Sequence, residues 1–148
     1  MKLTAELVPE TAWGKSLYNL LPREIWNELR EGFIKENGRK CQICGETSGK
    51  IYLHEIWNYD DQKHIQKLEG LILLCEMCNR IKHIGHTGIL ADEGKLDYDE
   101  VVNHFCKVNN CSKKEFYEHV DNAFKIWEKR SQHQWKQDFG EYGRYFKM

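Results

Sequence analysis

The sequence lacks any apolar run approaching the roughly 20 residues that a membrane-spanning helix requires. Its first residues also lack the apolar core of a signal peptide. No charge of one sign dominates, because 30% of the 148 residues are charged while the formal net charge is only −1. Domains that bind nucleic acids usually carry a clear basic excess, so any such contact would need a local basic patch. These absences predict a soluble, cytoplasmic, globular protein.

The chain also contains no internal repeat, no low-complexity segment, no glycine-rich nucleotide-binding loop and no Ser–His–Asp order. The last two absences remove support for other enzyme classes. Aromatic residues are abundant, at 12% of the chain with five Trp, which argues for a packed fold rather than disorder. A chain of this length fits one domain and can bury roughly 70% of its unfolded surface. A stable core is therefore expected without disulfides.

Apolar residues at helical spacing predict a helix over 22–36, with Pro22 in its first turn and Asn37-Gly38 at its end. Ser112 and Glu115 form a capping box that predicts the start of another helix. The remaining expected elements, in chain order, are an irregular arm over 1–21, a strand over 51–57, an apolar run over 71–74, a short helix over 78–84, a loop over 85–96, helices over 98–108 and 112–127, and a polar tail from 131.

Four of the six cysteines form two Cys-x-x-Cys pairs, Cys41/Cys44 and Cys75/Cys78. In a reducing compartment such cysteines are better interpreted as metal ligands or core thiols than as disulfides. A Cys-x-x-Cys turn lets both thiolates reach one ion, and two such turns complete a tetrahedron. Four soft ligands favour zinc or an iron centre over harder metals. The spacing therefore predicts a structural zinc site, with buried core thiols or a redox pair as the alternatives.

A second and looser set of metal-binding residue types lies in the C-terminal third. Its members are His104, Cys106, Cys111 and His119. Thiols near apolar helix positions are more commonly buried core residues. A second zinc site at these residues is therefore an alternative that the sequence does not favour.

The segment between the cysteine pairs contains His54-Glu55-Ile56-Trp57, and residues 71–83, LILLCEMCNRIKH, close it. On these motifs, residues 38–84 resemble the HNH endonuclease family, also called ββα-metal nucleases. Members of that family carry a metal ligand and a general base on one strand. A second strand runs into the second cysteine pair, and the following helix supplies further metal ligands.

The resemblance implies roles for individual residues. His54 falls on the metal-ligand position and Glu55 on the position of the base, which the family usually fills with His. Asn79 and His83 fall on the two helical ligand positions, and their i, i+4 spacing independently places them on one helix face. Gly70 stands where the family has its middle Asn. Strand alternation places His54 and Glu55 on opposite faces, although neighbouring residues share the site in the family.

Arg80 and Lys82, beside His83, form a small basic patch that is expected to hold phosphates without reading bases. The implied chemistry is hydrolysis of DNA phosphodiester bonds with Mg²⁺ or another divalent ion. A neutral imidazole accepts a proton from water near pH 7. Glu55 could replace it only with a pKa raised by burial, or as a weaker base.

The sequence thus predicts an α+β fold with a zinc-stapled ββα-metal core of the HNH-like, treble-clef type. The expected organisation is an N-terminal arm and helix over 1–37, the core over 38–86 and a helical region with a helical pair over 97–148. The expected function is a metal-dependent endonuclease acting on DNA. The alternative is a catalytically degenerate zinc module that binds nucleic acid, including RNA, or a protein partner, favoured by the departures at Glu55 and Gly70.

Overall fold

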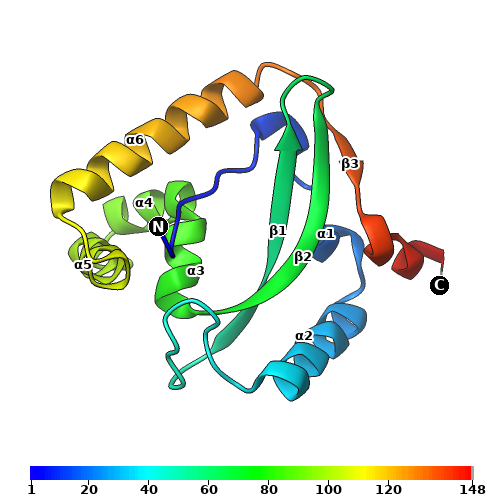
Figure 1. Ribbon diagram of the computed structural model, residues 1–148, viewed down its shortest axis with the longest axis horizontal. Helices are drawn as coiled ribbons and strands as arrows, with labels where there is room; N and C mark the ends of the chain where they lie inside the picture. Colours follow the sequence, from blue (N-terminus) through cyan, green and yellow to red (C-terminus); the bar gives the residue numbers. More distant parts are fainter. Residues whose placement is uncertain (148) are drawn as a thin grey trace.

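A long β-hairpin with helices on both sides organises the chain in the computed structural model, which describes residues 1–147 (Figure 1). The hairpin consists of β1 (Ile51–Asp60) and β2 (Ile65–Cys75). Before it come η1 (Glu10–Ala12), α1 (Leu17–Leu20) and α2 (Arg23–Asn37). After it come α3 (Glu76–Lys82), α4 (Ile84–Asp92), α5 (Tyr98–Asn109), α6 (Lys113–Arg130), β3 (Lys136–Asp138) and η2 (Gly140–Lys147). The predicted α+β class is confirmed.

The sheet has the strand order β1-β2-β3. β1 and β2 are antiparallel from the Ile51–Cys75 pair to the Asp60–Ile65 pair, with a register shift between Ile56 and Trp57. β3 lies parallel to the other edge of β2. β1 is therefore an outer strand, and its free edge borders the space between the N-terminal arm and α3 (Figure 1).

Two hydrophobic clusters cover the two faces of the hairpin. Alternate β1 residues Ile51 and Leu53 belong to the cluster with α1, α2 and η2, in which Trp26 is buried. The opposite face of β2 contributes Leu74 to the cluster with α3, α5 and α6. Because the side chains of adjacent residues in a strand point to opposite faces, each β1 side chain faces one of these two clusters.

The predicted helix boundaries have visible physical causes. Gly38 ends α2 with a φ of +83°, a conformation that glycine adopts without penalty. The Ser112 side chain accepts a hydrogen bond from the Glu115 backbone N–H, as expected for the N-cap of α6. Cys75 caps α3 in the same way, by accepting from the Cys78 N–H.

The expected loop over 85–96 is wrong, because Ile84–Asp92 forms α4. Gly85 and Gly88 suggested a break, but the helix is held by tertiary contacts. Thr87 is buried and donates its hydroxyl to the Arg80 carbonyl at 2.8 Å. At Gly85 an added Cβ would lie 3.7 Å from the Leu7 side chain, an ordinary van der Waals contact, so α4 packs beside the N-terminal arm at this position.

The expected helical region over 97–148 also needs correction, since its last part contributes β3 to the sheet. The buried Trp135 anchors this segment, and its indole N–H donates to the Arg130 carbonyl at 2.7 Å. The Lys136 N–H then donates to the His64 carbonyl at the tip of the hairpin. A three-residue strand is too short to show alternation, so the sequence pattern could not reveal it.

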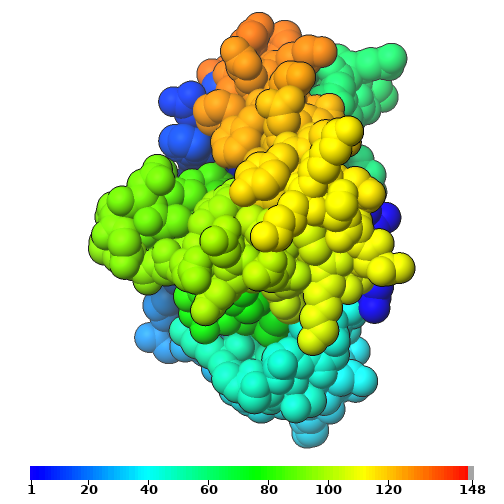
Figure 2. Space-filling view, turned by 90° about the vertical axis from the view of Figure 1, so that its left-hand side faces the viewer, coloured from blue at the N-terminus to red at the C-terminus, as the bar shows by residue number. Residues whose placement is uncertain are grey.

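In a space-filling view, α4, α5 and α6 form one face of the molecule, with the loop before β1 below them (Figure 2). Within residues 1–147, no helix combines the length and the apolar character needed to span a membrane.

Replacing Phe105 with Ala should destabilise the protein by about 3–5 kcal/mol, because Phe105 is fully buried and packs edge-on against Phe116. Chemical denaturation measures this free energy of unfolding. Ile126→Ala on α6 is the control, because Ile126 is 40% exposed and its removal should change stability by no more than about 0.5 kcal/mol. Equal effects of the two variants would contradict the assignment of the core.

Candidate functional site

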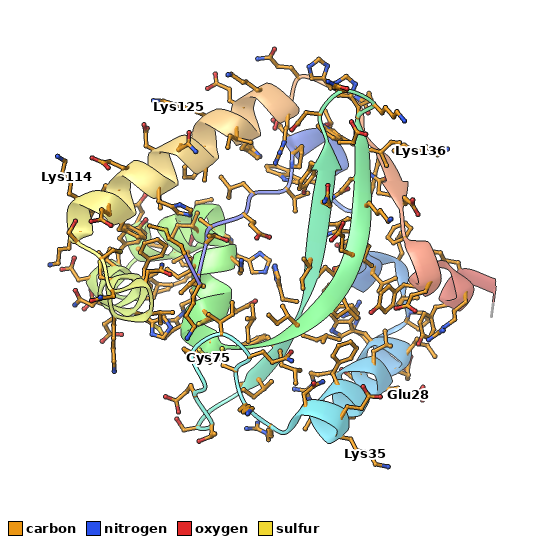
Figure 3. All side chains as sticks on the ribbon, viewed as in Figure 1. Glu28, Lys35, Cys75, Lys114, Lys125 and Lys136 are labelled. Atoms are coloured by element: carbon orange, nitrogen blue, oxygen red, sulfur yellow. The ribbon has the colours of Figure 1, made fainter. Side chains whose placement is uncertain are left out.

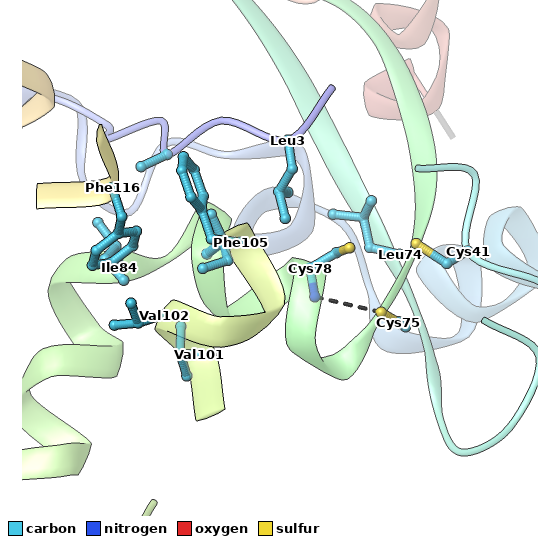
Figure 4. Packing of buried hydrophobic residues seen from close by; sticks show 12 residues of the cluster. Leu3, Cys41, Leu74, Cys75, Cys78, Ile84, Val101, Val102, Phe105 and Phe116 are labelled. Carbon is cyan, nitrogen blue, oxygen red and sulfur yellow. Dashed lines mark hydrogen bonds between the residues drawn. The ribbon is translucent and has the colours of Figure 1, made fainter. Parts of the chain in front are cut away.

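The four cysteine sulfurs of the two Cys-x-x-Cys pairs come together at the junction of β2 and α3. Their Sγ atoms all lie within 4.8 Å of one another, and the Cys44–Cys75 separation is 3.6 Å. Zn–S bonds of 2.3 Å in a tetrahedron separate sulfurs by about 3.8 Å. The four cysteines could therefore hold a metal ion, in an arrangement consistent with structural zinc. Figure 4 shows Cys41, Cys75 and Cys78 beside the buried core, and Figure 3 shows Cys75 at the start of α3.

Backbone amides support both cysteine turns. The Cys44 N–H donates to Cys41 Sγ at 3.5 Å, and the Cys78 N–H donates to Cys75 Sγ at 3.4 Å. Gly45 follows the first turn with a φ of +82°, which a residue with a Cβ would adopt only under strain. These N–H groups stabilise negative charge on sulfur, which is the state that binds a metal.

The first cysteine turn is also attached directly to β2. The Gln42 N–H donates to the Leu73 carbonyl, and the Leu73 N–H donates to the Gln42 side-chain oxygen, each at 2.8 Å. Since β2 itself delivers Cys75, this pair of bonds sets the distance between the two turns. The local geometry brings the sulfurs together from elements that are far apart in sequence.

A histidine from α5 contacts the sulfur cluster. His104 Nε2 lies 3.2 Å from Cys78 Sγ. Crowding by Cys41 and Cys75 raises the pKa of the Cys78 thiol, so the thiolate needs a nearby donor or cation. The sequence did not predict this contact, because His104 comes from a helix outside the cysteine turns.

The looser second set does not form a metal site. Among residues 1–147, the four cysteines are the only group of three or more His, Cys, Asp or Glu side chains with ligand atoms this close. His119, a member of the looser set, instead accepts a hydrogen bond from the Ala5 N–H at 2.9 Å.

His54 and His83 meet across the groove between β1 and α3. Their ring centroids are 5.1 Å apart and their planes are inclined by 78°. His83 is the C-cap residue of α3, where the chain turns into α4, and its backbone N–H donates to the Asn79 carbonyl. His54 is half-buried, and His83 has part of its surface exposed while the surrounding residues desolvate its ring. The two rings are close enough to share one ion with bonds of about 2 Å.

Burial keeps both imidazoles neutral near pH 7. It lowers the pKa of His54 to about 3, with a further contribution from the nearby His83 and Lys82. Burial also lowers the pKa of His83, and the neighbouring His86 adds to that effect. A neutral imidazole has the lone pair that a metal ligand requires.

The histidine pair lies in the wall of a cavity of about 1060 Å³ that follows the free edge of β1. Asn79 and His86 line the same cavity. The structure thus brings His54 and His83 together, and Asn79 lines the same cavity from α3. Gly70, at the position of the family's Asn, pairs with Ile56 beside the register shift, and a Cβ there would meet nothing within 4 Å.

Glu55 lies on the opposite face of β1 from His54 and is buried. Its carboxylate accepts hydrogen bonds from the Leu17 N–H at 2.6 Å and the Tyr18 N–H at 3.3 Å, at the start of α1. Burial raises the pKa of the Glu55 carboxyl, and these two amides oppose the rise. The structure therefore does not bring Glu55 to the histidine pair.

Arg80 and Lys82 have partners within the chain. The Arg80 guanidinium is 2.8 Å from a Glu76 carboxylate oxygen. The buried Lys82 ammonium contacts Glu6 and the Thr4 hydroxyl, each at 3.1 Å. Lys82 joins α3 to the N-terminal arm, whereas the Arg80–Glu76 pair lies within α3. The sequence alone did not reveal the partners of Lys82.

Comparisons of the chain with models of known protein families, with curated proteins and with solved structures find no match.

We expect the purified protein to carry about one zinc ion per chain and Cys75→Ser to lose it, because a missing thiolate opens the tetrahedron. Elemental analysis after dialysis measures the metal content. Cys106→Ser is the matched control, since Cys106 lies outside the four-sulfur group and should leave the zinc content unchanged. A metal-free native protein that folds normally would contradict the assignment.

Proposed function

We propose that the chain is a divalent-metal-dependent, HNH-like endonuclease that hydrolyses phosphodiester bonds in DNA. The observation that carries the proposal is the His54–His83 pair, 5.1 Å apart between ring centroids, on the strand and helix that flank the four cysteines. Zinc is the structural ion that we propose for the cysteines, because four thiolates in paired turns suit it.

The donor set at the histidine pair fits a divalent ion. Two neutral imidazoles and the Asn79 amide would hold it, leaving coordination positions for water and phosphate. Imidazole ligands suit transition metals better than Mg²⁺, so Mn²⁺ or Ni²⁺ belongs in any test beside Mg²⁺. Such an ion would polarise the scissile phosphate and stabilise the leaving oxygen.

The protein's own contribution is to fix and desolvate these ligands. His54 is fixed by the pairing of β1 with β2, where it lies opposite Ile72. His83 is fixed by the turn between α3 and α4. Since both imidazoles are neutral near pH 7, binding of a metal ion would not require either ring to release a proton.

A catalytically degenerate zinc module is the second candidate. It is favoured by the contact of Glu55 with α1, which leaves the family's base position without a group facing His54. Such a module would bind nucleic acid or a protein partner through the same cavity without cutting. The two candidates predict different results in a cleavage assay.

Incubation with plasmid and with single-stranded DNA in Mg²⁺, Mn²⁺ or Ni²⁺ should give cleavage that His54→Ala and His83→Ala reduce by about 100-fold or more. His133→Ala is the matched control, because His133 stacks on His64 and does not line the cavity. Gel electrophoresis of the products measures the rate. Absence of cleavage above these variants in every metal would leave the binding module.

Glu55→Gln should fold and retain cleavage, because its amide oxygen can still accept the shorter bond, from the Leu17 N–H, and only the 3.3 Å bond from the Tyr18 N–H to the other oxygen is lost. We therefore propose Glu55 as a positioning residue for α1. Glu55→Ala removes the acceptor and should reduce stability by about 1–3 kcal/mol. Loss of cleavage in a fully folded Glu55→Gln protein would instead support the role as base.

Stability measured against pH separates the two Glu55 variants further. Burial raises the pKa of the Glu55 carboxyl above its ordinary value of 4.5, so the folded state binds the proton more tightly than the unfolded state. The native protein should accordingly lose stability as pH rises from about 4.5 through the folded-state pKa. Glu55→Gln should lack this part of the dependence.

A further inference from the structure

Three residues of different chemical character follow one another along β1 in the wall of the cavity beside the histidine pair. Tyr52 and His54 are alternate residues of β1, so they lie on one face about 7 Å apart, and Lys50 directly precedes the strand. The Lys50 ammonium lies 4.8 Å from the centre of the Tyr52 ring. A cation, an aromatic ring and a proposed metal ligand thus follow one another along the same cavity wall.

The ionisable groups lining the cavity give it an excess of positive charge. The cations are Arg23, Arg30, Lys50 and Lys82, and the acids are Glu6 and Glu55. Glu6 and Lys82 pair with each other, Arg30 pairs with Glu31, and the amides of α1 bind Glu55. Arg23 and Lys50 are the two cavity cations that form no ion pair among the described residues. The chain as a whole has a formal net charge of −1, so this excess is local. It complements a polyanion.

Exposed aromatic rings line the same cavity. Trp13 is 60% exposed and Tyr18 is 47% exposed. Trp13 stacks on Trp127 at 6.4 Å between centroids, and both indole N–H groups donate to the Val8 carbonyl. The Trp13 ring is therefore held in place with much of its surface open. Fixed, exposed rings of this kind are platforms on which bases stack.

Unpaired bases are the groups that fit these platforms. In a duplex each base is stacked on its neighbours, and a protein ring meets it only after the base is unstacked. A positively charged groove with aromatic rings is characteristic of single-strand binding. The His54–His83 pair also lies within the cavity wall rather than on a convex surface, which favours a thin, flexible strand over a rigid duplex.

We propose that this cavity binds single-stranded DNA, with Lys50 contacting a phosphate and Tyr52 stacking on a base next to the proposed cleavage site. The inference rests on the proposed function for the site of cleavage, but the binding that it describes does not require cleavage. Arg23 and Arg30 extend the basic side of the same cavity.

The test is fluorescence anisotropy of a labelled oligothymidylate of about 15 nucleotides, with a duplex of equal length as competitor, in EDTA to prevent cleavage. Zinc content is checked afterwards, so that loss of the structural ion is not mistaken for loss of binding. The single strand should bind at least tenfold more tightly than the duplex. Lys50→Ala should weaken binding and reduce the slope of log affinity against log salt by about 0.7, the value for one phosphate of a single strand.

Tyr52→Leu should weaken binding by about fivefold or more, while Tyr52→Phe should retain it, because only a ring can stack on a base. The matched controls lie on α6, outside the cavity: Lys114→Ala, whose side chain points outward in Figure 3, and Tyr117→Ala. Neither control should change affinity.

Equal affinity for duplex and single strand, or unchanged binding in both Lys50→Ala and Tyr52→Leu, would overturn the inference even if the protein cuts DNA. Selective single-strand binding that depends on Lys50 and Tyr52, without cleavage in any metal, would support the inference and remove the proposed nuclease function. The two proposals therefore fail independently.

Discussion

The geometry of the candidate site depends on the gathering of four sulfurs where β2 becomes α3. Cys75 is both the last residue of β2 and the N-cap of α3, so a cation held by the cysteines would fix the angle between strand and helix. That angle decides where the other end of α3 lies, and His83 is the residue that ends it. The bonds of Gln42 to Leu73 and the contact of His104 with Cys78 extend the constraint to the first cysteine turn and to α5. A cation at the four sulfurs would therefore stabilise the relative positions of β1 and α3, on which the His54–His83 contact depends.

Side chains of neighbouring residues in β1 point to opposite faces of the strand, so they contact different parts of the protein. His54 faces α3 and meets His83, whereas Glu55 faces α1 and accepts its first amides. A buried carboxylate is costly unless it is paired or hydrogen-bonded. Glu55 meets this requirement on the side away from His54, where it bonds the backbone of Leu17, a member of the cluster with α1, α2 and η2. The same alternation that places His54, the proposed metal ligand, beside α3 thus directs the adjacent Glu55 toward α1.

The parts of this arrangement that follow from local spacing were predictable. Paired cysteines predicted the four-sulfur group, and the i, i+4 relation of Asn79 and His83 placed both on one side of α3. The HNH resemblance stays a prediction. Tertiary contacts were not predictable from local patterns. The buried Thr87 of α4 bonds the Arg80 carbonyl, and Trp135, just before β3, is buried beside the hairpin. Partners such as Glu6 for Lys82 lie far away in the chain, and no local pattern encodes them.

Those distant ion pairs also determine which cations are available to a substrate. Lys82 is next to His83 in sequence, but its ammonium is buried against Glu6 and Thr4 and attaches the N-terminal arm to α3. Turning it toward a phosphate would leave Glu6 unpaired and remove one of the contacts that hold the arm carrying Trp13. Lys50 has no such role in the described structure beyond its contact with the Tyr52 ring, so it can bind a phosphate without loss of a structural ion pair. A protein of nearly zero net charge needs a local basic patch to bind a polyanion. The sequence alone located that patch on α3, at Arg80 and Lys82, whereas the available cation Lys50 lies beside β1.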